Sequence, residues 1–331
     1  MSQGNASSPG GAAQGAPLPE AGYRSSGNLE KVLRGGHFSV TGELGPPRHA
    51  DARDVREKAR HLKGNVDSVN ITDNQTAVVR MSSLAASVIA QEEGLEANMQ
   101  MVARDRNRIA MQSDILGAAA LGIRNLLVLS GDHQVFGDHP GAKNVYDLDS
   151  VNLLRAVRGM RDDGELLSGQ KLPEGGRPRL FIGAAYNPFA DPEEFRVLRA
   201  AKKIAAGADF LQSQCIYDMD RFKRFMARAV DMGLTEKAFF IAGVTPLKSL
   251  GMAKYMKNSV PGITMPESCI ERLKGVAKEK QAEEGIRMAC EQIEEFKGMA
   301  GVSGVHLMLV EWEHMVPTIV KEARLVPRPA P

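Results

Sequence analysis

The chain has 331 residues, of which 43% are hydrophobic and 25% are charged, an ordinary composition for a globular protein. Its 42 Lys and Arg residues nearly balance 40 Asp and Glu residues, and the resulting net charge of +2 argues against nucleic acid or an anionic membrane as a partner. The 3 Cys residues form no CxxC pair, so we expect neither a disulfide framework nor a structural zinc site, and the expected location is the reducing cytoplasm.

The first 28 residues differ in composition from the rest of the chain. They are rich in Gly, Ala, Ser and Pro, carry almost no charge and lack the apolar core of a signal peptide. We therefore expect a disordered tail over residues 1–28 and one folded domain over residues 29–331. No apolar run approaches the length of a membrane-spanning helix, so we expect no membrane association.

From Phe38 onwards, short strand-like segments alternate with longer segments of helical periodicity. The expected strands cover residues 38–42, 66–72, 96–102, 125–129, 179–185, 209–214, 237–243 and 304–310. The expected helices cover residues 50–64, 79–91, 108–121, 150–162, 192–206, 219–232, 247–257, 267–279, 285–297 and 315–322. Nearly continuous apolar strands are typical of a parallel sheet, and a GxGxxG turn that would favour a doubly wound sheet is missing. We predict an α/β fold, a single (β/α)8 TIM barrel.

Polar residues stand where the predicted strands end, and these ends form the active face of such a barrel. They are Glu43, Thr72, Gln100, Asp132, Tyr186 with Asn187, Gln214, and Glu311 with Trp312. Behind Glu43, two prolines in Gly45-Pro46-Pro47 make a stiff turn. Taken singly, each polar residue is also compatible with an ordinary turn. The strand ends carry no Lys and no His or Cys cluster, so we expect neither a Schiff-base aldolase nor a metal site.

These segments resemble the methylenetetrahydrofolate reductase family of flavin-dependent barrel enzymes over residues 35–327, and most closely its bacterial and acetogen-like branch. The run Glu43-Leu44-Gly45-Pro46-Pro47-Arg48 is similar to the family's Glu-aromatic-aromatic-Pro-Pro-Arg signature, and it is the most specific match. Leu129-Ser130-Gly131-Asp132 is similar to the family's Leu-Arg-Gly-Asp segment. Further similar stretches are residues 69–72, 145–149, 184–188, 203–209 and 213–218.

The resemblance implies reduction of 5,10-methylenetetrahydrofolate to 5-methyltetrahydrofolate by a bound reduced flavin, FAD or alternatively FMN, in one-carbon and methionine metabolism. It implies that a neutral Glu43 protonates N10 as the folate ring opens, and that an ionised Asp132 stabilises the resulting iminium cation. The implied flavin-binding residues are Thr72, Gln100, Ser130, Gly131, Asp132, Tyr146, Asp149, Ala185, Tyr186 and Lys203. The implied folate-binding residues are Glu43, Gln214, Tyr217, Leu250 and Trp312.

Four residues depart from the family pattern. Ser130 and Trp312 each stand in place of an Arg, Gln100 in place of a His, and Leu250 in place of an aromatic residue. These departures leave the electron donor open between NADH, NADPH and a partner electron-transfer subunit. Two other functions also stay open: a non-catalytic or electron-relay flavin subunit of a larger complex, and a flavin-free pterin-binding barrel enzyme. A homo-oligomer is compatible with the sequence, which does not decide the oligomeric state.

Overall fold

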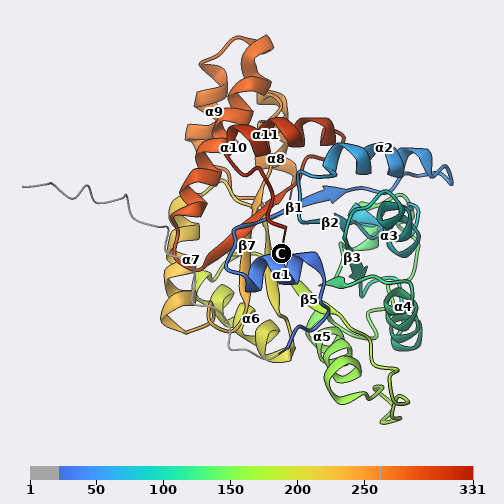
Figure 1. The fold of residues 1–331 in the computed structure, drawn as a ribbon. Helices are drawn as coiled ribbons and strands as arrows, with labels where there is room; N and C mark the ends of the chain where they lie inside the picture. Colours follow the sequence, from blue (N-terminus) through green and yellow to red (C-terminus); the bar gives the residue numbers. More distant parts are fainter. Residues whose placement is uncertain (1–21, 261, 331) are drawn as a thin grey trace, which may run out of the picture.

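A computed structural model of the chain describes residues 22–260 and 262–330. Within these residues, eight parallel strands form a closed barrel in which each strand pairs with its neighbours in the sequence and the last pairs with the first (Figure 1). The strands are β1 (Ser39–Leu44), β2 (Ser68–Ile71), β3 (Ala97–Val102), β4 (Asn125–Leu129), β5 (Phe181–Tyr186), β6 (Phe210–Cys215), β7 (Phe239–Val244) and β8 (Val302–Leu307). The predicted barrel is confirmed, because each strand overlaps one that the sequence predicts.

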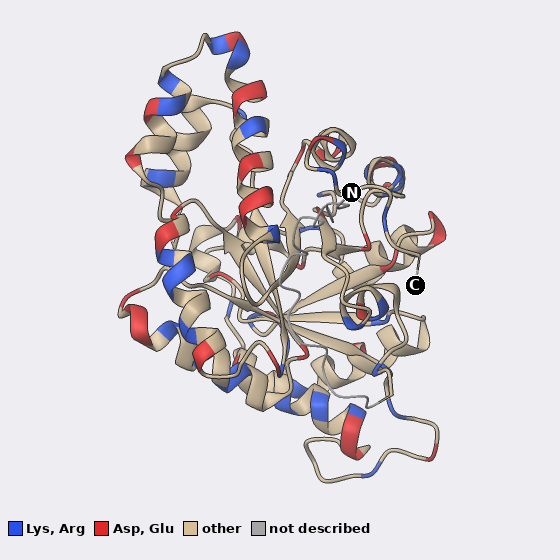
Figure 2. Ribbon diagram, turned by 60° about the vertical axis from the view of Figure 1, so that its left-hand side comes forward, with Lys and Arg blue, Asp and Glu red and all other residues tan. Residues whose placement is uncertain are grey.

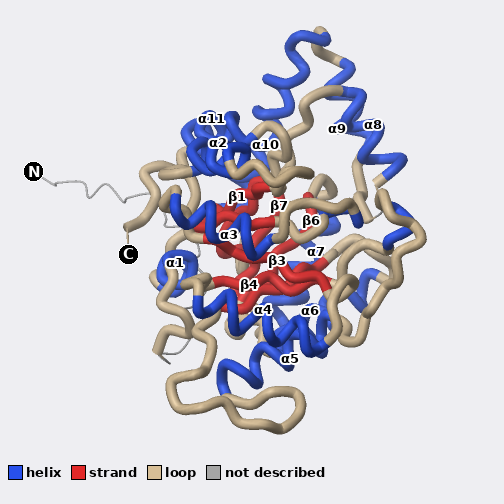
Figure 3. Tube along the Cα trace, turned by 90° about the vertical axis from the view of Figure 1, so that its right-hand side faces the viewer, coloured by secondary structure: helices blue, strands red, loops and turns tan. Residues whose placement is uncertain are grey.

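Helices surround the barrel (Figure 3). They are α2 (Arg53–Leu62), α3 (Ser83–Glu92), α4 (Arg108–Ala120), α5 (Ser150–Arg158), α6 (Glu193–Ala206), α7 (Met219–Asp231), α10 (Gln281–Lys297) and α11 (Val316–Glu322). After β7, α8 (Leu250–Ser259), α9 (Glu267–Lys274) and the start of α10 project beyond the barrel as an arm (Figures 1 and 3). Short helical turns are η1 (Gln75–Ala77), η2 (Gln134–Phe136), η3 (Gly159–Asp163), η4 (Lys278–Lys280) and η5 (Glu313–Met315). Basic and acidic residues are interspersed along the outer helices and the arm (Figure 2).

Helix α7 illustrates how the sequence encodes this outer layer. Asp218 caps the first turn, because its carboxylate accepts a hydrogen bond of 3.0 Å from the backbone N–H of Arg221. Buried residues at helical spacing turn one face toward the barrel, and these are Phe222, Phe225, Met226 and Ala229. Burying each large apolar side chain stabilises the fold by about 1.5–3 kcal/mol. Gly233, with a φ of +63°, then ends the helix in a left-handed turn.

The N-terminal end of the barrel is closed by α1 (Asn28–Arg34), a helix that the sequence analysis did not predict. Leu29 and Leu33 of this helix pack against three aromatic side chains inside the barrel, Phe181, Phe210 and Phe239. The carboxylate of Glu96, which lies just before β3, accepts hydrogen bonds from the N–H groups of Asn28 and Leu29 and so caps the start of the helix. A tertiary contact thus stabilises a helix too short to be stable alone.

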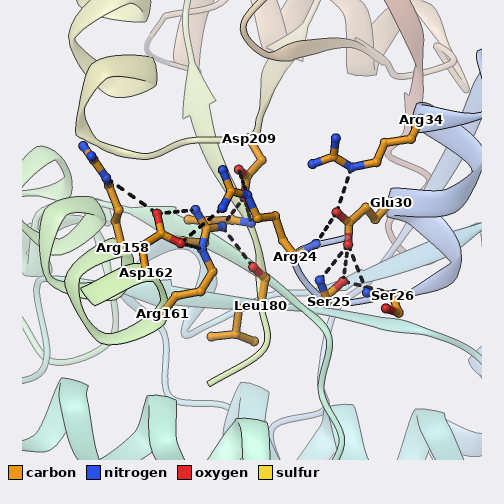
Figure 4. Close-up of polar contacts among 12 residues, drawn as sticks. Arg24, Ser25, Ser26, Glu30, Arg34, Arg158, Arg161, Asp162, Leu180 and Asp209 are labelled. Atoms are coloured by element: carbon orange, nitrogen blue, oxygen red, sulfur yellow. Dashed lines mark hydrogen bonds and ion pairs between the residues drawn. The ribbon is translucent and has the colours of Figure 1, made fainter. Parts of the chain in front are cut away.

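Polar contacts hold the segment before α1 against the barrel (Figure 4). Buried Glu30 accepts hydrogen bonds from the backbone N–H groups of Arg24 (2.6 Å) and Ser25 (2.7 Å). The Arg24 guanidinium in turn lies 3.5 Å from the carboxylate of Asp162. Residues 1–21 of the expected tail lie outside the described residues, whereas residues 24–28 are bonded to the barrel. The folded domain therefore begins earlier than the expected boundary at residue 29.

The interior of the barrel has a polar half and an apolar half. Strands β4 to β7 contribute the apolar side chains that contact α1, including Leu127 and Ile241. Strands β1 to β3 instead place polar residues at alternating positions, namely Ser39, Thr41 and Glu43 on β1, Ser68 and Asn70 on β2, and Asn98 and Gln100 on β3. One of these contacts is a hydrogen bond of 2.7 Å from Nδ2 of Asn98 to Oδ1 of Asn70. The polar half leads directly to the C-terminal mouth of the barrel.

Several element boundaries differ from the sequence predictions. The first strand continues to Leu44, so Glu43 lies within it rather than beyond its end. The last strand ends at Leu307 instead of residue 310, and α9 ends at Lys274, next to Gly275. Helix α3 begins at Ser83 instead of residue 79, because Ser82 caps it. Among the described residues, every helix is too short or too polar to cross a bilayer.

Candidate active site

Glu43 lies at the mouth of the barrel, on the polar side of its interior. Its side chain is almost buried, with 9% of the residue exposed. Its Oε2 atom lies 3.4 Å from Nε2 of His306, a fully buried residue of the neighbouring strand β8. The other ring nitrogen of His306, Nδ1, shares a hydrogen bond of 2.9 Å with Oγ1 of Thr41. The imidazole is therefore held at both nitrogens and fixes the orientation of the Glu43 carboxyl group.

The turn behind Glu43 is anchored from two sides. The Lys58 ammonium lies 3.4 Å from the carbonyl oxygen of Gly45 and 2.7 Å from a carboxylate oxygen of Glu311, which ties the loops after β1 and β8 together. On the other side, the Arg80 guanidinium donates to the carbonyl oxygen of Pro46 at 2.9 Å. Together with the two prolines, these contacts make the segment after Glu43 rigid.

The loop after β4 places Asp132 and Tyr146 together. Gly131 has a φ of +85°, and a Cβ atom there would lie only 3.0 Å from Cβ of Val102, so the position requires glycine. The Tyr146 hydroxyl donates to the carbonyl oxygen of Gly131 at 3.3 Å. Asp132 exposes its side chain, while its carbonyl oxygen accepts a hydrogen bond of 2.9 Å from buried Arg104. Burial raises the pKa of Tyr146, Arg104 opposes this shift, and the charge of Asp132 reinforces it.

Buried polar atoms line the mouth above β2 and β3. Oγ1 of Thr72 and Oε1 of Gln75 are both buried and have no hydrogen-bond partner in the part of the chain that the structure describes. Gln100, on β3, is 8% exposed. Gly45 lies next to the oxygen atoms of Thr72 and Gln75, and because it has no side chain it does not cover them. Buried polar groups normally find a partner, so this lining fits the polar edge of a heteroaromatic ring such as a flavin or a pterin.

Lys203, on α6, supplies a cation between the loops after β4 and β5. Its ammonium donates a hydrogen bond to the carbonyl oxygen of Ala185. Burial and, to a lesser extent, the charge of Arg199 lower the pKa of Lys203 to about 8, while Asp149 acts in the opposite direction. The Asp149 side chain also caps α5, accepting from the N–H of Asn152 at 2.7 Å. A buried ammonium of this kind fits an anionic group such as a phosphate.

The Ser130 hydroxyl lies 3.2 Å from the hydroxyl of Ser150, the first residue of α5. Ser130 therefore joins the end of β4 to the start of the following helix.

The remaining predicted residues follow β6, β7 and β8. A bulge at the end of β6 exposes Gln214, and the Ser213 hydroxyl stabilises it by donating to the carbonyl oxygen of Gln214 at 2.7 Å. Tyr217 donates its hydroxyl to the carbonyl oxygen of Thr245 at 2.9 Å and borders a cavity of about 180 Å³ beneath the arm. Burial raises the pKa of Tyr217.

Leu250 is the first residue of α8, at the base of the arm, and Trp312 lies in the loop after β8. The N–H of Leu250 donates to Oε1 of Gln281 on α10 at 2.9 Å, so Leu250 is part of the junction between the arm and the barrel. The Lys248 ammonium stands 5.2 Å from the ring centroid of Trp312, a cation–π contact.

Tyr186 does not reach the mouth. Its ring stacks on Phe225 of α7 at a centroid distance of 5.3 Å and meets Phe240 edge-on at 5.7 Å. Strand alternation explains this position, because Ala185 faces the barrel interior and the next residue must face the helices. The structure thus separates Tyr186 from the other residues that the resemblance implies for flavin binding.

Three residues at the mouth were missed by the sequence analysis. His306 and Thr41 are register partners across the β1–β8 junction that closes the barrel. The available signal was a polar residue within each of the two strands, Thr41 in β1 and His306 in β8. The sequence does not show that these residues are neighbours, because β1 and β8 pair only when the barrel closes. Buried Arg104 follows β3 and gave no signal beyond its position after a strand.

Sequence comparisons with known proteins agree on one family. The family model described as "Methylenetetrahydrofolate reductase" matches residues 28–324. The chain is 23% identical to "Methylenetetrahydrofolate reductase 2" of Schizosaccharomyces pombe over 256 residues, 76% of this chain and 39% of that protein. It is 26% identical to "5,10-methylenetetrahydrofolate reductase" of Pectobacterium carotovorum over 219 residues, 65% of this chain and 66% of that protein. The matches therefore span less than two thirds of the length of these relatives.

Among solved structures, the fold is similar to that of an uncharacterised Clostridium thermocellum protein, described as binding two copies of 5-methyl-5,6,7,8-tetrahydrofolic acid. The TM-score is 0.59 at 13% identity, and the match covers 90% of this chain and 98% of the other. At this identity the similarity supports the barrel fold.

Proposed function

The chain belongs to the methylenetetrahydrofolate reductase family, and we propose that it reduces 5,10-methylenetetrahydrofolate to 5-methyltetrahydrofolate with a bound flavin, as an enzyme of one-carbon metabolism. The observation that carries the proposal is the carboxyl group of Glu43, held at the barrel mouth by His306 at 3.4 Å.

A flavin, when bound, would supply the hydride to the methylene carbon of the folate. The residues that would hold it surround the mouth. They are Thr72, Gln100, Ser130, Gly131, Asp132, Tyr146 and Ala185, with Lys203 and Asp149 on the side expected to face its phosphate. The buried unpartnered oxygen of Thr72 and the buried ammonium of Lys203 support this assignment. Tyr186 would act only indirectly, through packing.

Opening of the folate ring needs an acid, because an unprotonated N10 is a poor leaving group. Glu43 would donate this proton, and general acid catalysis of this kind is worth on the order of 10²–10⁴-fold in rate. His306 would keep the carboxyl group aimed at the substrate, because both of its ring nitrogens are engaged. The rigid Gly45-Pro46-Pro47 turn would prevent the acid from swinging away.

Asp132 would stabilise the iminium cation that ring opening creates. Its side chain is exposed at the mouth while its backbone is held by Arg104, so the carboxylate can face a ligand without disturbing the loop. Gln214, re-aimed by the bulge in β6, would present its amide donor and acceptor to the pterin. Tyr217, Leu250 and Trp312 would border the rest of the folate.

The departures from the family pattern also bear on the electron donor. Ser130 and Leu250 replace residues that the family uses near the flavin, so we propose that the protein accepts electrons from a partner subunit in preference to free NADH. Anaerobic stopped-flow mixing with NADH should then bleach the flavin slowly or not at all, whereas dithionite should reduce it fully. Rapid and saturable bleaching at micromolar NADH would restore NADH as the donor.

The visible spectrum of the purified protein tests the function itself. We expect flavin absorption bands, or their appearance when the apoprotein is mixed with FAD or FMN. After anaerobic reduction, adding methylenetetrahydrofolate should restore the oxidised spectrum and yield methyltetrahydrofolate. A protein that stays colourless and binds no added flavin would contradict the proposed function.

A further inference from the structure

We propose that Gln75 recognises the N3–H group of the flavin ring and thereby sets the affinity of the protein for flavin. This inference rests on the proposed function and extends it to a residue that the family resemblance does not imply for flavin binding. It starts from Oε1 of Gln75, which is buried and has no hydrogen-bond partner among residues 22–260 and 262–330. An unsatisfied buried carboxamide oxygen destabilises the free protein, so it is expected to serve a ligand.

The position of Gln75 favours a ligand at the mouth. A Cβ atom on Gly45 would lie 3.6 Å from Oε1 of Gln75 and 3.9 Å from Oγ1 of Thr72, which is also buried and unpartnered within the described part of the chain. Both oxygens thus border the same point, next to the strand that carries Glu43. Any larger side chain at Gly45 would cover them. Glycine keeps this pair of oxygens accessible.

The loop that carries Gln75 is held in one conformation. Three of its non-glycine residues are left-handed: Asn74 (φ 42°), Thr76 (φ 56°) and Ala77 (φ 58°). The carbonyl oxygen of Asn74 accepts from Arg104 at 3.2 Å, and the side-chain amide of Asn74 donates to Asp105 at 3.2 Å. Such a strained and anchored backbone fixes the position from which the Gln75 side chain leaves the loop before any ligand binds.

The same loop contacts the segment expected to border the flavin. A Cβ atom on Gly137, just after η2, would clash with the backbone of Ala77, so the loops after β2 and β4 touch directly. The loop after β4 carries Asp132 and Tyr146. Gln75 therefore stands on the flavin side of the mouth rather than on the side of Gln214, which favours the flavin over the pterin as its ligand.

The hydrogen-bonding capacity of Gln75 and Thr72 indicates which flavin atoms they would contact. A carboxamide oxygen can only accept a hydrogen bond, whereas the neighbouring Thr72 hydroxyl can donate one. The oxidised flavin ring has a single N–H donor, N3–H, flanked by two carbonyl acceptors. An acceptor beside a donor matches this edge, with Gln75 taking the N–H and Thr72 serving an adjacent carbonyl.

The test compares FAD with N3-methyl-FAD, which lacks the N–H donor, by fluorescence titration of the apoprotein. Wild type should bind FAD about tenfold or more tightly than the methylated analogue, as expected for one buried hydrogen bond. Gln75→Leu should weaken FAD binding by about tenfold and lose the preference. Gln75→Glu keeps an acceptor oxygen and should retain the preference, which provides a second variant if the first fails to fold. Gln91→Leu, at the far end of α3, is the matched control and should behave as wild type.

The possible results distinguish a failure of the role proposed for Gln75 from a failure of the proposed function. Equal binding of both flavins by wild type, or a preference that survives in Gln75→Leu, would overturn the role of Gln75 while leaving the flavin itself in place. Unchanged flavin binding in Gln75→Leu with weakened folate binding would assign the residue to the pterin and would also overturn the proposal. If wild type binds neither flavin, the proposed function fails and this inference fails with it.

Discussion

His306 Nε2 lies 3.4 Å from Glu43 Oε2, although the two residues are 263 positions apart in the sequence. The contact exists because β8 pairs with β1, with Thr41 and His306 in register at the junction that closes the barrel. Thr41, two residues before Glu43 on the same strand, shares a hydrogen bond of 2.9 Å with the other ring nitrogen, Nδ1. The first and last strands of the barrel thus build a single polar unit, Glu43–His306–Thr41.

This unit predicts that His306 positions the Glu43 acid. His306→Leu should slow reoxidation of the reduced flavin by methylenetetrahydrofolate by roughly 10–100-fold, the worth of a hydrogen bond to an ionisable group. The KM for folate and the rate of flavin reduction by dithionite should change little. His306→Gln, which can still donate to Glu43, should recover part of the rate. Rapid-quench and stopped-flow measurements of both half-reactions decide the point.

Two substitutions at Thr41 provide a matched comparison for the His306 variants. Thr41→Ser keeps the hydroxyl and should behave as wild type, whereas Thr41→Val removes it with little change in volume and should resemble a mild His306 variant. An equal fall in both half-reactions in His306→Leu would indicate a purely structural role and contradict the positioning role.

Asp132 is expected to act on the substrate cation rather than on the fold. Asp132→Asn leaves the backbone contact with Arg104 intact, so the variant should fold and bind flavin. Reoxidation by folate should slow by about tenfold or more because the iminium loses a facing carboxylate. Asp147→Asn, in the same loop but paired with Arg108 at 2.8 Å, is the control. Unchanged folate turnover in Asp132→Asn would remove this residue from the mechanism.

Lys203 predicts a pH dependence of stability. Burial lowers its pKa from 10.5 to about 8, so between these values the unfolded chain holds a proton that the folded protein has released. The free energy of unfolding of wild type should therefore rise with pH in this window, by at most about 1.4 kcal/mol per pH unit from this group. Below pH 8 the ammonium is charged in both states and its burial opposes folding.

Comparison with Lys203→Met isolates this contribution. The stability of the variant relative to wild type should fall by about 2 kcal/mol between pH 7.5 and 9.5 in urea unfolding, since only wild type gains. Lys202→Met, at the exposed neighbouring position, should show no such change. A difference that stays constant with pH in Lys203→Met would show that the ammonium is not buried in solution.

Much of the architecture follows from local pattern. Apolar runs such as Leu126–Val128 of β4 and capping residues such as Asp218 report strand burial and helix starts directly, so the barrel was predictable. Helix α1 was not predicted, because its cap is Glu96, a residue 67 positions from Leu29. Its apolar spacing at Leu29 and Leu33 was visible, but seven residues are too few for a sequence pattern to be decisive.

The positions of the candidate site residues were predictable only where these residues stand at a strand end. Glu43 and Asp132 were proposed from such positions, and both lie at the barrel mouth. The contact with His306 was not, because a pattern along one strand does not state which partner closes the barrel. Tyr186 shows the opposite failure: a one-residue shift along β5 turns its side chain from the interior to the helices.

The central claim is that Glu43 is the acid that opens the folate ring, and single-turnover reoxidation of the reduced Glu43→Gln variant by methylenetetrahydrofolate tests it most directly. The variant keeps the shape of the side chain and a donor and an acceptor for His306, but it has no proton to release to N10. We expect normal flavin content, normal flavin reduction by dithionite, and reoxidation by folate slower than wild type by roughly 10² or more. Reoxidation at a rate near that of wild type would contradict the account and place the acid elsewhere.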